Sequence, residues 1–382
     1  MIQLLQDIET MEPILRTHAA RGEAIGHLPD EVVQAMRALG LYHMSTPARL
    51  GGLELNPIEI AQVIERVSEI DSAAGWGLTN PTGCGSIVAR CPEDGIAGLL
   101  AETPLPMITG SLNVPLHATP EADGFRVRGK ATLVSNFREA DYILMALLPE
   151  PDAAPAPPTL VLVPTSACRI TREWNGLGMR GTGTVDVEVE EVFIPATRSF
   201  AFASDTPLSR HHAGDLYRFP VIAHCLCTFA PVALGVARQA LAAIESLVRS
   251  KVAFSDQMVL LDRETTHAMI GEAHALYRSA RHTVYHSTGE MWEKTLSGKE
   301  IGPADKAASL ADAVQVVRSC ATAVQIVFDL AGSDAIQAPN IFERCQRDVA
   351  LIKNHGYFSW RRYASVGKAL LGLESEFAMI YV

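Results

Sequence analysis

The side chain in this sequence best suited to moving a proton is His355, which is followed directly by Gly356, Tyr357 and Phe358. The glycine predicts a break in a helix, and the aromatic residues predict an apolar pocket around the imidazole. The pKa of histidine lies near neutrality, so His355 can accept a phenol or hydroperoxide proton and return it. The alternative is a core histidine with a purely structural role, which is common for a lone histidine in an apolar segment.

A second candidate is the pair Ser135 and Asn136, within the stretch Gly124–Tyr142. Apolar and charged residues alternate over 125–128, Gly129 predicts a turn, and a second predicted strand then ends in this polar pair. Such an end offers backbone groups and a hydroxyl along one edge, which can bind a flat heterocycle. The alternative is a surface hairpin in which the polar pair only forms the turn.

The elements that must position these residues fall into three regions. Residues 1 to about 104 have helical periodicity, with helices predicted from Leu28 to Gly40, from near Pro57, and from Asp71 through Trp76. The small residues after Asp71 indicate close helix packing. From 104 to about 202 the apolar period is two, which predicts a small β-domain, most simply a barrel.

Two segments of this β-domain are distinctive. The apolar run 160–163 predicts a buried strand, and the five prolines of 149–158 predict an exposed loop. Residues 204–217 form a polar linker, after which helical periodicity returns. The pattern is helical from Phe219 onward, with an apolar face over Ala233–Val248, and further helices are predicted at about 262–296, 303–331 and 340–373, which describes a four-helix bundle.

Composition limits the classes of function. The chain has 382 residues, 48% of them apolar, and a formal charge of −11, and it lacks a dense run of basic residues. Nucleic acid is therefore not an expected partner. The N-terminus is not a signal peptide and the apolar run from Val221 is short for a membrane span, so we expect a soluble, cytoplasmic protein without membrane contact. The seven cysteines are predicted to be buried free thiols. His282 and His286, one helical turn apart, are interpreted as a helix face and not as a metal site.

Three sequence blocks resemble a known family. The block 129–142, GKATLVSNFREADY, resembles the flavin-edge strand of acyl-CoA dehydrogenases and of their relatives, the two-component monooxygenases that use reduced flavin. The block 174–195 resembles the strand that follows, and the block 343–372 resembles the C-terminal helix that carries the catalytic residue. The blocks occur in family order along nearly the whole chain.

The resemblance implies an α+β fold with three domains. These are an N-terminal α-helical domain (1–104), a central β-barrel domain (105–208) and a C-terminal four-helix bundle domain (209–382). It also implies a homotetramer.

The resemblance implies two kinds of site residue. His355 and Ser135 are the implied catalytic residues, with Ser135 beside flavin N5, where a hydroxyl slows the loss of peroxide. The implied cofactor-binding residues are Ser135, Asn136, Trp76, Ser111, Arg249 and Gly332. Ser111 falls in a flavin-binding loop, and Arg249 falls where relatives place a phosphate-binding arginine, often reaching across a subunit interface. A helix C-terminal charge is the alternative role of Arg249. Residues 332–334 match a phosphate site of some relatives, but carry an acid where those relatives have arginine.

The resemblance also separates two branches of the family. Acyl-CoA dehydrogenases need a glutamate base, often shortly after an Arg-Asp pair. Here Arg347 and Asp348 form the pair, but no glutamate lies between Glu343 and Glu374. Glu245, on an earlier helix, has the pattern of a solvated helix face. A histidine at position 355 is what the monooxygenase branch offers.

We therefore expect an oxygenase component that uses reduced flavin (FMN or FAD) and O2 to hydroxylate a small aromatic substrate, such as a phenol or indole, through a flavin C4a-hydroperoxide. The chain lacks a nicotinamide fingerprint, so a separate flavin reductase must supply the reduced flavin. The alternatives are oxidation of nitrogen or sulfur on the same fold, an acyl-CoA dehydrogenase with a displaced base, and a non-catalytic flavin-binding relative.

Overall fold

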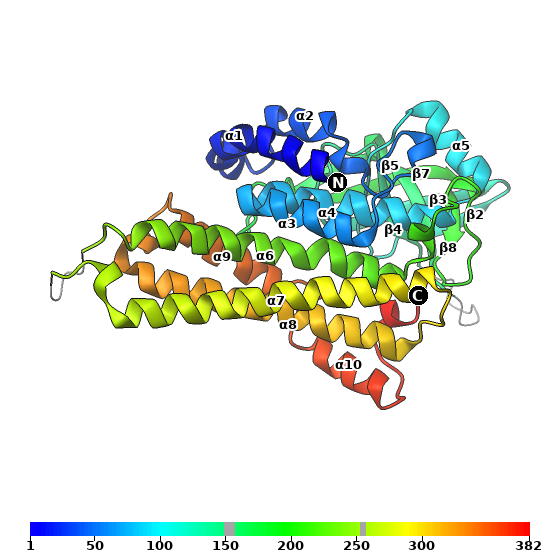
Figure 1. Cartoon of the computed structure of the whole chain (residues 1–382). Helices are drawn as coiled ribbons and strands as arrows, with labels where there is room; N and C mark the ends of the chain where they lie inside the picture. Colours follow the sequence, from blue (N-terminus) through cyan, green and yellow to red (C-terminus); the bar gives the residue numbers. More distant parts are fainter. Residues whose placement is uncertain (149–156, 253–256) are drawn as a thin grey trace.

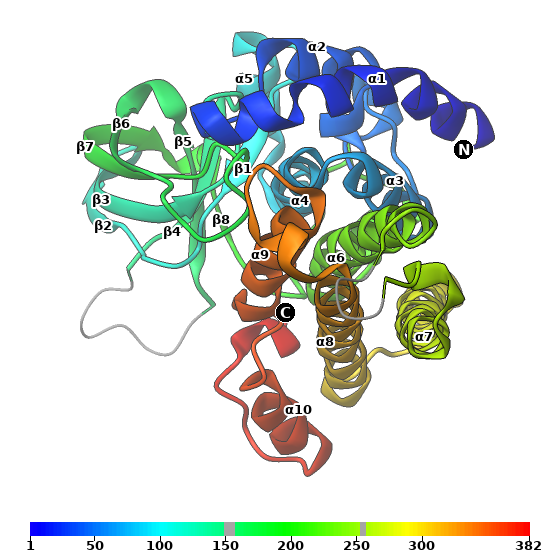
Figure 2. The ribbon, with the colours of Figure 1, turned by 90° about the vertical axis from the view of Figure 1, so that its left-hand side faces the viewer.

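The computed structural model describes residues 1–148, 157–252 and 257–382. Most of the predicted proline-rich loop, 149–158, lies outside these residues. The described chain has a layer of helices, a group of strands and an elongated helical bundle (Figures 1 and 2). The helices before the strands are α1 (Ile2–Ile25), α2 (Asp30–Ala38), α3 (Pro57–Ile70), α4 (Ser72–Ile87) and α5 (Glu93–Glu102).

Capping side chains fix where α3 and α4 begin. The Asn56 side chain accepts hydrogen bonds from the backbone N–H groups of Ile58 and Glu59, each at 3.0 Å, and the Glu59 carboxylate accepts from Asn56 N at 3.1 Å. This reciprocal pair satisfies N–H groups that a helix N-terminus otherwise leaves free. Asp71 caps α4 in the same sense by accepting from Ala73 N at 2.9 Å.

The small residues at the start of α4 allow the close packing that the sequence predicts. A Cβ on Gly75 would lie 1.8 Å from the Oγ of Ser68 on α3. Gly235 on α6 (Val221–Leu247) also approaches Ser68 closely, since its Cβ would lie 2.4 Å from Ser68 Cβ. Glycine is required at both positions because any side chain would push the three helices apart.

The central region contains two four-stranded sheets. One has the order β1 (Ile108–Gly110), β4 (Tyr142–Ala146), β5 (Thr159–Pro164), β8 (Ser199–Ala201), and the other β2 (His117–Glu121), β3 (Gly124–Val134), β7 (Val185–Pro195), β6 (Cys168–Glu173). Apolar residues from both sheets form one cluster, which includes Val127, Ile143, Val161 and Val187. Packing across this cluster joins the sheets of the predicted barrel. Directly before β2, Leu116 adds backbone hydrogen bonds to the β4 side: its N–H donates to Ala146 O at 2.8 Å, and its carbonyl accepts from Leu148 N at 2.7 Å.

The prediction of a turn at Gly129 is wrong. The stretch from Gly124 to Val134 is one strand, with irregular register against β7 between Val127 and Gly129 and again between Ala131 and Val134. Gly129 has a φ of 149°, and a Cβ there would lie 3.0 Å from Leu116. The glycine therefore marks a bulge inside a strand and does not reverse the chain. The buried strand predicted at 160–163 is confirmed, since all four residues are fully buried in β5.

The C-terminal helices are α6, α7 (Glu264–Leu296), α8 (Pro303–Ala331), α9 (Ile341–Asn354) and α10 (Arg362–Leu370). The helix predicted at 340–373 is thus two helices, and the predicted break falls at His355. Helices α6, α7 and α8 lie side by side, and α10 projects from the bundle (Figures 1 and 2). Helices α6 and α8 have the length and composition of a membrane span, but the most apolar window of α6 is 94% buried inside the protein, as in a core helix.

Candidate active site

A cavity of about 880 Å³ lies where α4, the strands β1 and β3, the segment before β7, α6 and the α9–α10 junction meet. Figure 2 shows α4 next to β1 at this place. Four of the residues predicted to form the site line this cavity: Trp76, Ser111, Ser135 and His355. They come from positions up to 279 residues apart in the chain (355 − 76), so only the fold brings them together.

One wall of the cavity is a chain of hydroxyl groups. The indole N–H of Trp76 donates to Ser135 Oγ at 3.2 Å, and Ser135 Oγ is hydrogen-bonded to Thr184 Oγ1 at 2.8 Å. Thr184 is in turn bonded to Thr182 Oγ1 at 2.7 Å, and Thr182 donates to the carbonyl of Met179 at 2.9 Å. This chain fixes the Ser135 rotamer and presents its oxygen to the cavity.

The backbone around Ser135 is held as firmly. Thr109 Oγ1 donates to the Ser135 carbonyl at 2.6 Å, and Asn136 N donates to the carbonyl of Thr182 at 3.3 Å. Asn136 has a φ of 58°, and its buried Oδ1 has no hydrogen-bond partner among the described residues. Asn136 lies behind the cavity wall and is not among the residues that line it. Ser111 donates to the carbonyl of Thr132 at 2.8 Å, at the same wall.

The opposite wall is aromatic. His355 follows the last residue of α9 with extended backbone angles (φ −59°, ψ 150°), which turns the chain away from the helix axis. Its ring stacks on Phe229 (centroids 5.2 Å apart, 15° between planes) and meets Trp76 edge-on at 5.4 Å. The Tyr357 N–H donates to His355 Nδ1 at 3.4 Å, and His355 Nε2 has no protein partner within the described ranges. Nε2 is therefore the atom open to a bound molecule.

Burial lowers the pKa of His355 to about 4, and the nearby positive charge of Arg362 acts in the same direction. The imidazole is therefore neutral at physiological pH. Burial also raises the pKa of Tyr357 well above its usual value, and the Tyr357 hydroxyl is hydrogen-bonded to the Cys225 thiol, whose pKa burial raises to about 11. The ionisable groups at this wall are thus all uncharged, except Arg362.

Arg347 and Asp348 do not line the cavity but hold its walls together. Asp348 accepts hydrogen bonds from Ser72 Oγ at 2.5 Å and from Met179 N at 2.6 Å, which ties α9 to α4 and to the segment before β7. Arg347 pairs with Glu23 of α1 at 3.0 Å and with Glu343 at 2.8 Å. The Arg-Asp pair is therefore a structural junction of four segments.

No carboxylate lines the cavity among the described residues. Glu245, the alternative base, lies near the far end of α6, where it accepts from His274 Nε2 at 2.7 Å and pairs with Arg238 at 3.5 Å. Its side chain is 38% exposed, as predicted for a solvated helix face. The cavity thus lacks the base that removal of a proton next to a thioester requires.

Comparison with known proteins agrees with this geometry. Residues 9–94 match the model of the acyl-CoA dehydrogenase N-terminal domain, and residues 227–360 match that of the acyl-CoA dehydrogenase C-terminal domain. The two matched ranges together cover more than half of the chain. The chain belongs to the acyl-CoA dehydrogenase family.

Within this family, the chain is similar to flavin-dependent monooxygenases. It is 27% identical to the indole-3-acetate monooxygenase of Pseudomonas putida over 91% of this chain and 88% of that protein. It is 25% identical to the oxygenase component of an FADH2-dependent resorcinol hydroxylase from Rhizobium sp., over 98% and 95%.

Solved structures share the fold. The Rhodococcus 3-HSA hydroxylase superposes with a TM-score of 0.90 at 20% identity, covering 98% of both chains. XiaF from Streptomyces, solved with FADH2 and glycerol, has a TM-score of 0.90 at 20% identity, covering 98% of this chain and 96% of that chain. The α+β architecture expected from the sequence is therefore that of this family.

Two predicted cofactor residues lie away from the cavity. Arg249 is exposed beyond the end of α6, 20 residues from Phe229 (249 − 229), which is about 30 Å along a helix at ~1.5 Å per residue. Gly332 follows the last residue of α8, with a φ of 67°, and Lys251 Nζ lies 3.7 Å from where its Cβ would be. Lys251 also donates to Ala331 O at 2.5 Å, so Arg249 and Gly332 lie at the same end of the bundle.

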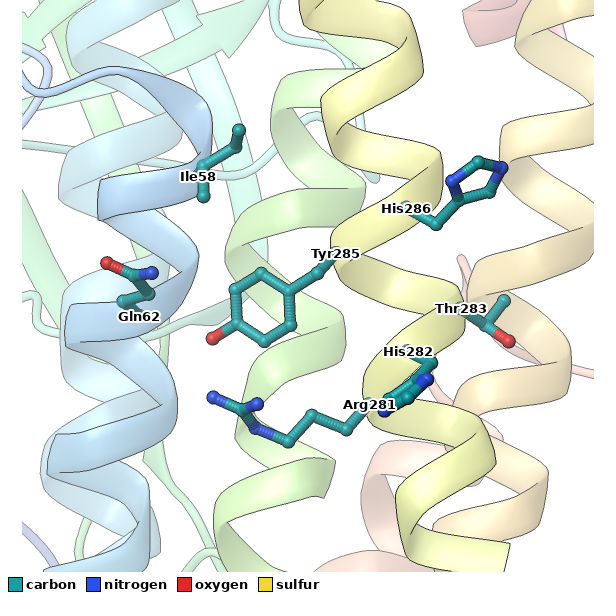
Figure 3. A pocket seen from close by; sticks show the side chains of 7 residues that line it. All are labelled: Ile58, Gln62, Arg281, His282, Thr283, Tyr285 and His286. Carbon is teal, nitrogen blue, oxygen red and sulfur yellow. The ribbon is translucent and has the colours of Figure 1, made fainter.

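A second hollow, between α3 and α7, contains His282 and His286 (Figure 3). There Tyr285 and Arg281 point towards α3, whereas His286 points away from it. Tyr285 and Arg281 both bind the buried carboxylate of Glu65, at 2.5 Å and 2.8 Å. Within the described residues, no three His, Cys, Asp or Glu side chains are grouped so that they could hold a metal ion.

Sequence reasoning missed several residues of the cavity. Thr182 and Thr184 complete the hydroxyl chain, and the sequence signal for them was the run Gly181-Thr182-Gly183-Thr184 just before β7. Phe229, Cys225 and Arg362 also line the cavity. Nothing in the periodicity separates the first two from ordinary core residues of α6. All seven cysteines are free, as expected, but Cys168 is only half-buried.

The residues present suit a reduced flavin. Hydroxyl and amide groups at one wall and aromatic rings at the other match the edge and the faces of a flat heterocycle. Gly83, at the cavity, has open space where a Cβ would stand. The volume lies within the range of about 300–1,000 Å³ that small-molecule sites occupy.

Proposed function

We propose that this protein is the oxygenase component of a two-component monooxygenase, which uses reduced flavin and O2 to hydroxylate a small aromatic substrate. The observation that carries the proposal is a neutral histidine facing a buried serine across a cavity that has no carboxylate among its described residues. The relatives named for oxidation of indole-3-acetate and resorcinol support an aromatic substrate.

His355 is proposed as the acid/base. With Nδ1 held by Tyr357 N, the free Nε2 is the atom through which a substrate proton is exchanged. A pKa of about 4 makes His355 a weak base. Burial also disfavours a charged phenolate in the cavity, so a phenol hydrogen-bonded to Nε2 stays protonated in the resting complex. It transfers its proton to His355 only as the reaction proceeds. Its stacking on Phe229 holds the ring without charge compensation.

Ser135 is proposed to bind the flavin edge. When bound, reduced flavin supplies the electrons that activate O2 and the site at which oxygen is transferred. The hydroxyl chain from Trp76 to Met179 fixes the Ser135 oxygen before the cofactor arrives, so little reorganisation is needed. Ser111 lies on the same wall, and the apolar lining of the cavity keeps bulk water away from the reaction.

The remaining partners follow from this proposal. A separate reductase, as expected for an oxygenase component, delivers reduced FMN or FAD. Arg249, too far from the cavity of its own chain, binds the flavin phosphate only if a partner subunit brings it there, which agrees with a homotetramer. The protein acts in the cytoplasm without nucleic acid or membrane partners.

The test mixes the purified protein anaerobically with reduced flavin and an aromatic substrate panel, then admits ¹⁸O2. Incorporation of one ¹⁸O atom into an aromatic product, with the second atom released as water, supports the proposal. Reduction of bound oxidised flavin by an acyl-CoA would instead indicate an acyl-CoA dehydrogenase. Oxygen incorporation only into amines or sulfides would indicate a monooxygenase that oxidises nitrogen or sulfur.

A further inference from the structure

One cationic side chain lines the cavity among its described residues. Arg362, at the first position of α10, contributes to the wall beside His355 and Tyr357. The chain as a whole carries a formal charge of −11. A positive cavity inside an acidic protein indicates that the bound molecule is itself anionic.

The Arg362 guanidinium is fixed in place by two contacts. It lies over the Phe377 ring, with Cζ 3.9 Å from the ring centroid, and Nε donates to the Gly356 carbonyl at 2.6 Å. These contacts use one face and one N–H group, and leave both terminal nitrogens without a protein partner in the described parts of the chain. That is the arrangement in which arginine binds a carboxylate through two parallel hydrogen bonds.

Arg362 has no ion-pair partner among the described residues. Glu376, the acidic residue that acts most on it, is exposed and accepts hydrogen bonds from Ser365 Oγ and Lys368 Nζ, each at 2.9 Å. Arg344 and Arg347, on the neighbouring helix, are each paired with carboxylates. A partly buried arginine without a counter-ion is costly unless a ligand supplies the charge.

We propose that the aromatic substrate of this enzyme carries a carboxylate and that Arg362 binds it. This inference rests on the proposed function and names the class of its substrate as an aromatic acid. The carboxylate on Arg362 places the acidic end of the substrate beside the α9–α10 junction, and the ring then extends towards Phe229 and the Ser135 wall. Arg362 is thus a residue that determines specificity, and His355 remains the proton-exchanging group.

The test is equilibrium binding of indole-3-acetate and of the neutral isostere indole-3-acetamide, measured by calorimetry without flavin or turnover. The wild-type protein is expected to bind the acid about 10- to 100-fold more tightly than the amide, the range for hydrogen bonds to a charged group. The variant Arg362→Gln is expected to lose this preference. Arg362→Lys keeps the charge without the two-pronged geometry, and is expected to retain part of it.

The matched control is Arg361→Gln. Arg361 is the preceding residue, it is exposed, and it does not line the cavity. The proposal fails if the wild-type protein binds the amide as tightly as the acid, a result that does not depend on whether any variant folds. It also fails if Arg361→Gln lowers acid binding as much as Arg362→Gln does.

The anion that faces Arg362 has a second possible source, the flavin phosphate. Comparing reduced FMN with reduced riboflavin, which lacks the phosphate, separates the two. A loss of FMN preference over riboflavin in Arg362→Gln, with acid preference intact, overturns the proposal. Oxygen consumption by the wild-type protein with reduced flavin tests the oxygenase function separately, so the two failures are distinguishable.

Discussion

The middle of α9 and its C-terminal end differ in how their charged groups are paired. At its middle, Arg344 pairs with Asp71 at 2.8 Å, Arg347 pairs with Glu23 and Glu343, and Asp348 is fully occupied by donors. At its C-terminus, His355 is neutral with a free Nε2, and beyond it Arg362 has two free terminal nitrogens within the described structure.

Both parts of α9 contain buried ionisable groups whose pKa values depart from the usual range, yet the two parts have different roles. Burial raises the pKa of Asp348 and lowers that of His355. Asp348 is surrounded by protein partners and holds three elements together, whereas His355 faces a cavity with an unused nitrogen. A perturbed pKa alone therefore does not separate a candidate for catalysis from a structural group, whereas an atom that has no protein partner and faces a cavity marks the candidate.

We expect the largest effect on activity at His355. His355→Ala should lower the rate of aromatic hydroxylation by about 10²–10⁴-fold, the usual contribution of a positioned acid/base. For a phenolic substrate, pH above the phenol pKa should restore part of the rate, because solvent then removes the proton. Single-turnover hydroxylation across pH measures the effect, and thermal unfolding measures folding. Hydroxylation at the wild-type rate would make His355 a structural residue.

Asp348, in the middle of α9, should instead act on folding. Asp348→Ala leaves the Ser72 hydroxyl and the Met179 N–H without their acceptor and removes one of the carboxylates beside Arg344, and loss of one member of a buried ion pair costs about 3–5 kcal/mol. Urea unfolding measures this loss. Glu121→Gln, which breaks the surface pair with Arg126, is the control and should cost less than about 1 kcal/mol. Equal losses in both variants would contradict the structural role.

Substitution of Arg249 tests whether a second subunit completes the flavin-phosphate site, which is incomplete within one chain. If it binds the flavin phosphate of a partner subunit, Arg249→Ala should weaken reduced-flavin affinity by about 1.5–3 kcal/mol, the range for a charged hydrogen bond. Affinity is measured by anaerobic titration, with oligomer mass checked in parallel. Unchanged affinity in an unchanged oligomer would remove Arg249 from the site.

The same contrast shows what sequence can predict. The helices and the strand pattern follow from local periodicity, so α3, α7, α8 and β5 lie close to where they were expected. Ser135 and His355 stand in motifs that resemble a family, and so could be found. Thr184 and Arg362 could not be found in this way. The role of Thr184 depends on its hydrogen bond to Ser135, 49 residues earlier in the chain (184 − 135). The role of Arg362 depends on the fold that brings Phe377 against its guanidinium. The bulge at Gly129 was predicted as a turn because glycine is common in both bulges and turns.

The pH dependence of folding distinguishes a neutral buried histidine from a charged one. The pKa of His355 is about 4 in the folded protein and about 6.5 when exposed, so the unfolded chain binds more protons between these values. Stability is therefore present above pH 6.5 and is lost as pH falls towards 4. His355→Gln should reduce the loss in unfolding free energy between pH 7 and pH 5 by about 2 kcal/mol. The remaining loss of stability at low pH should persist, because burial also lowers the pKa values of His43, His212 and His224 to about 4. A pH profile identical to wild type would mean that His355 is exposed or charged.

The smallest effect is expected at Ser135, on the wall opposite His355. Ser135→Ala removes one neutral hydrogen bond to the cofactor edge. A hydrogen bond of about 1 kcal/mol corresponds to a roughly fivefold change in the ratio of peroxide release to product formation. The fraction of consumed O2 that is released as hydrogen peroxide should rise by about that factor, while His355 still exchanges protons. Thr184→Ser is the matched control, because it keeps the hydroxyl bonded to Ser135 Oγ, and it should couple oxygen to product as the wild type does. Peroxide release and product are quantified in the same reaction. If Ser135→Ala couples as tightly as Thr184→Ser, the serine acts only as a link in the hydroxyl chain, and the aromatic wall alone protects the reaction.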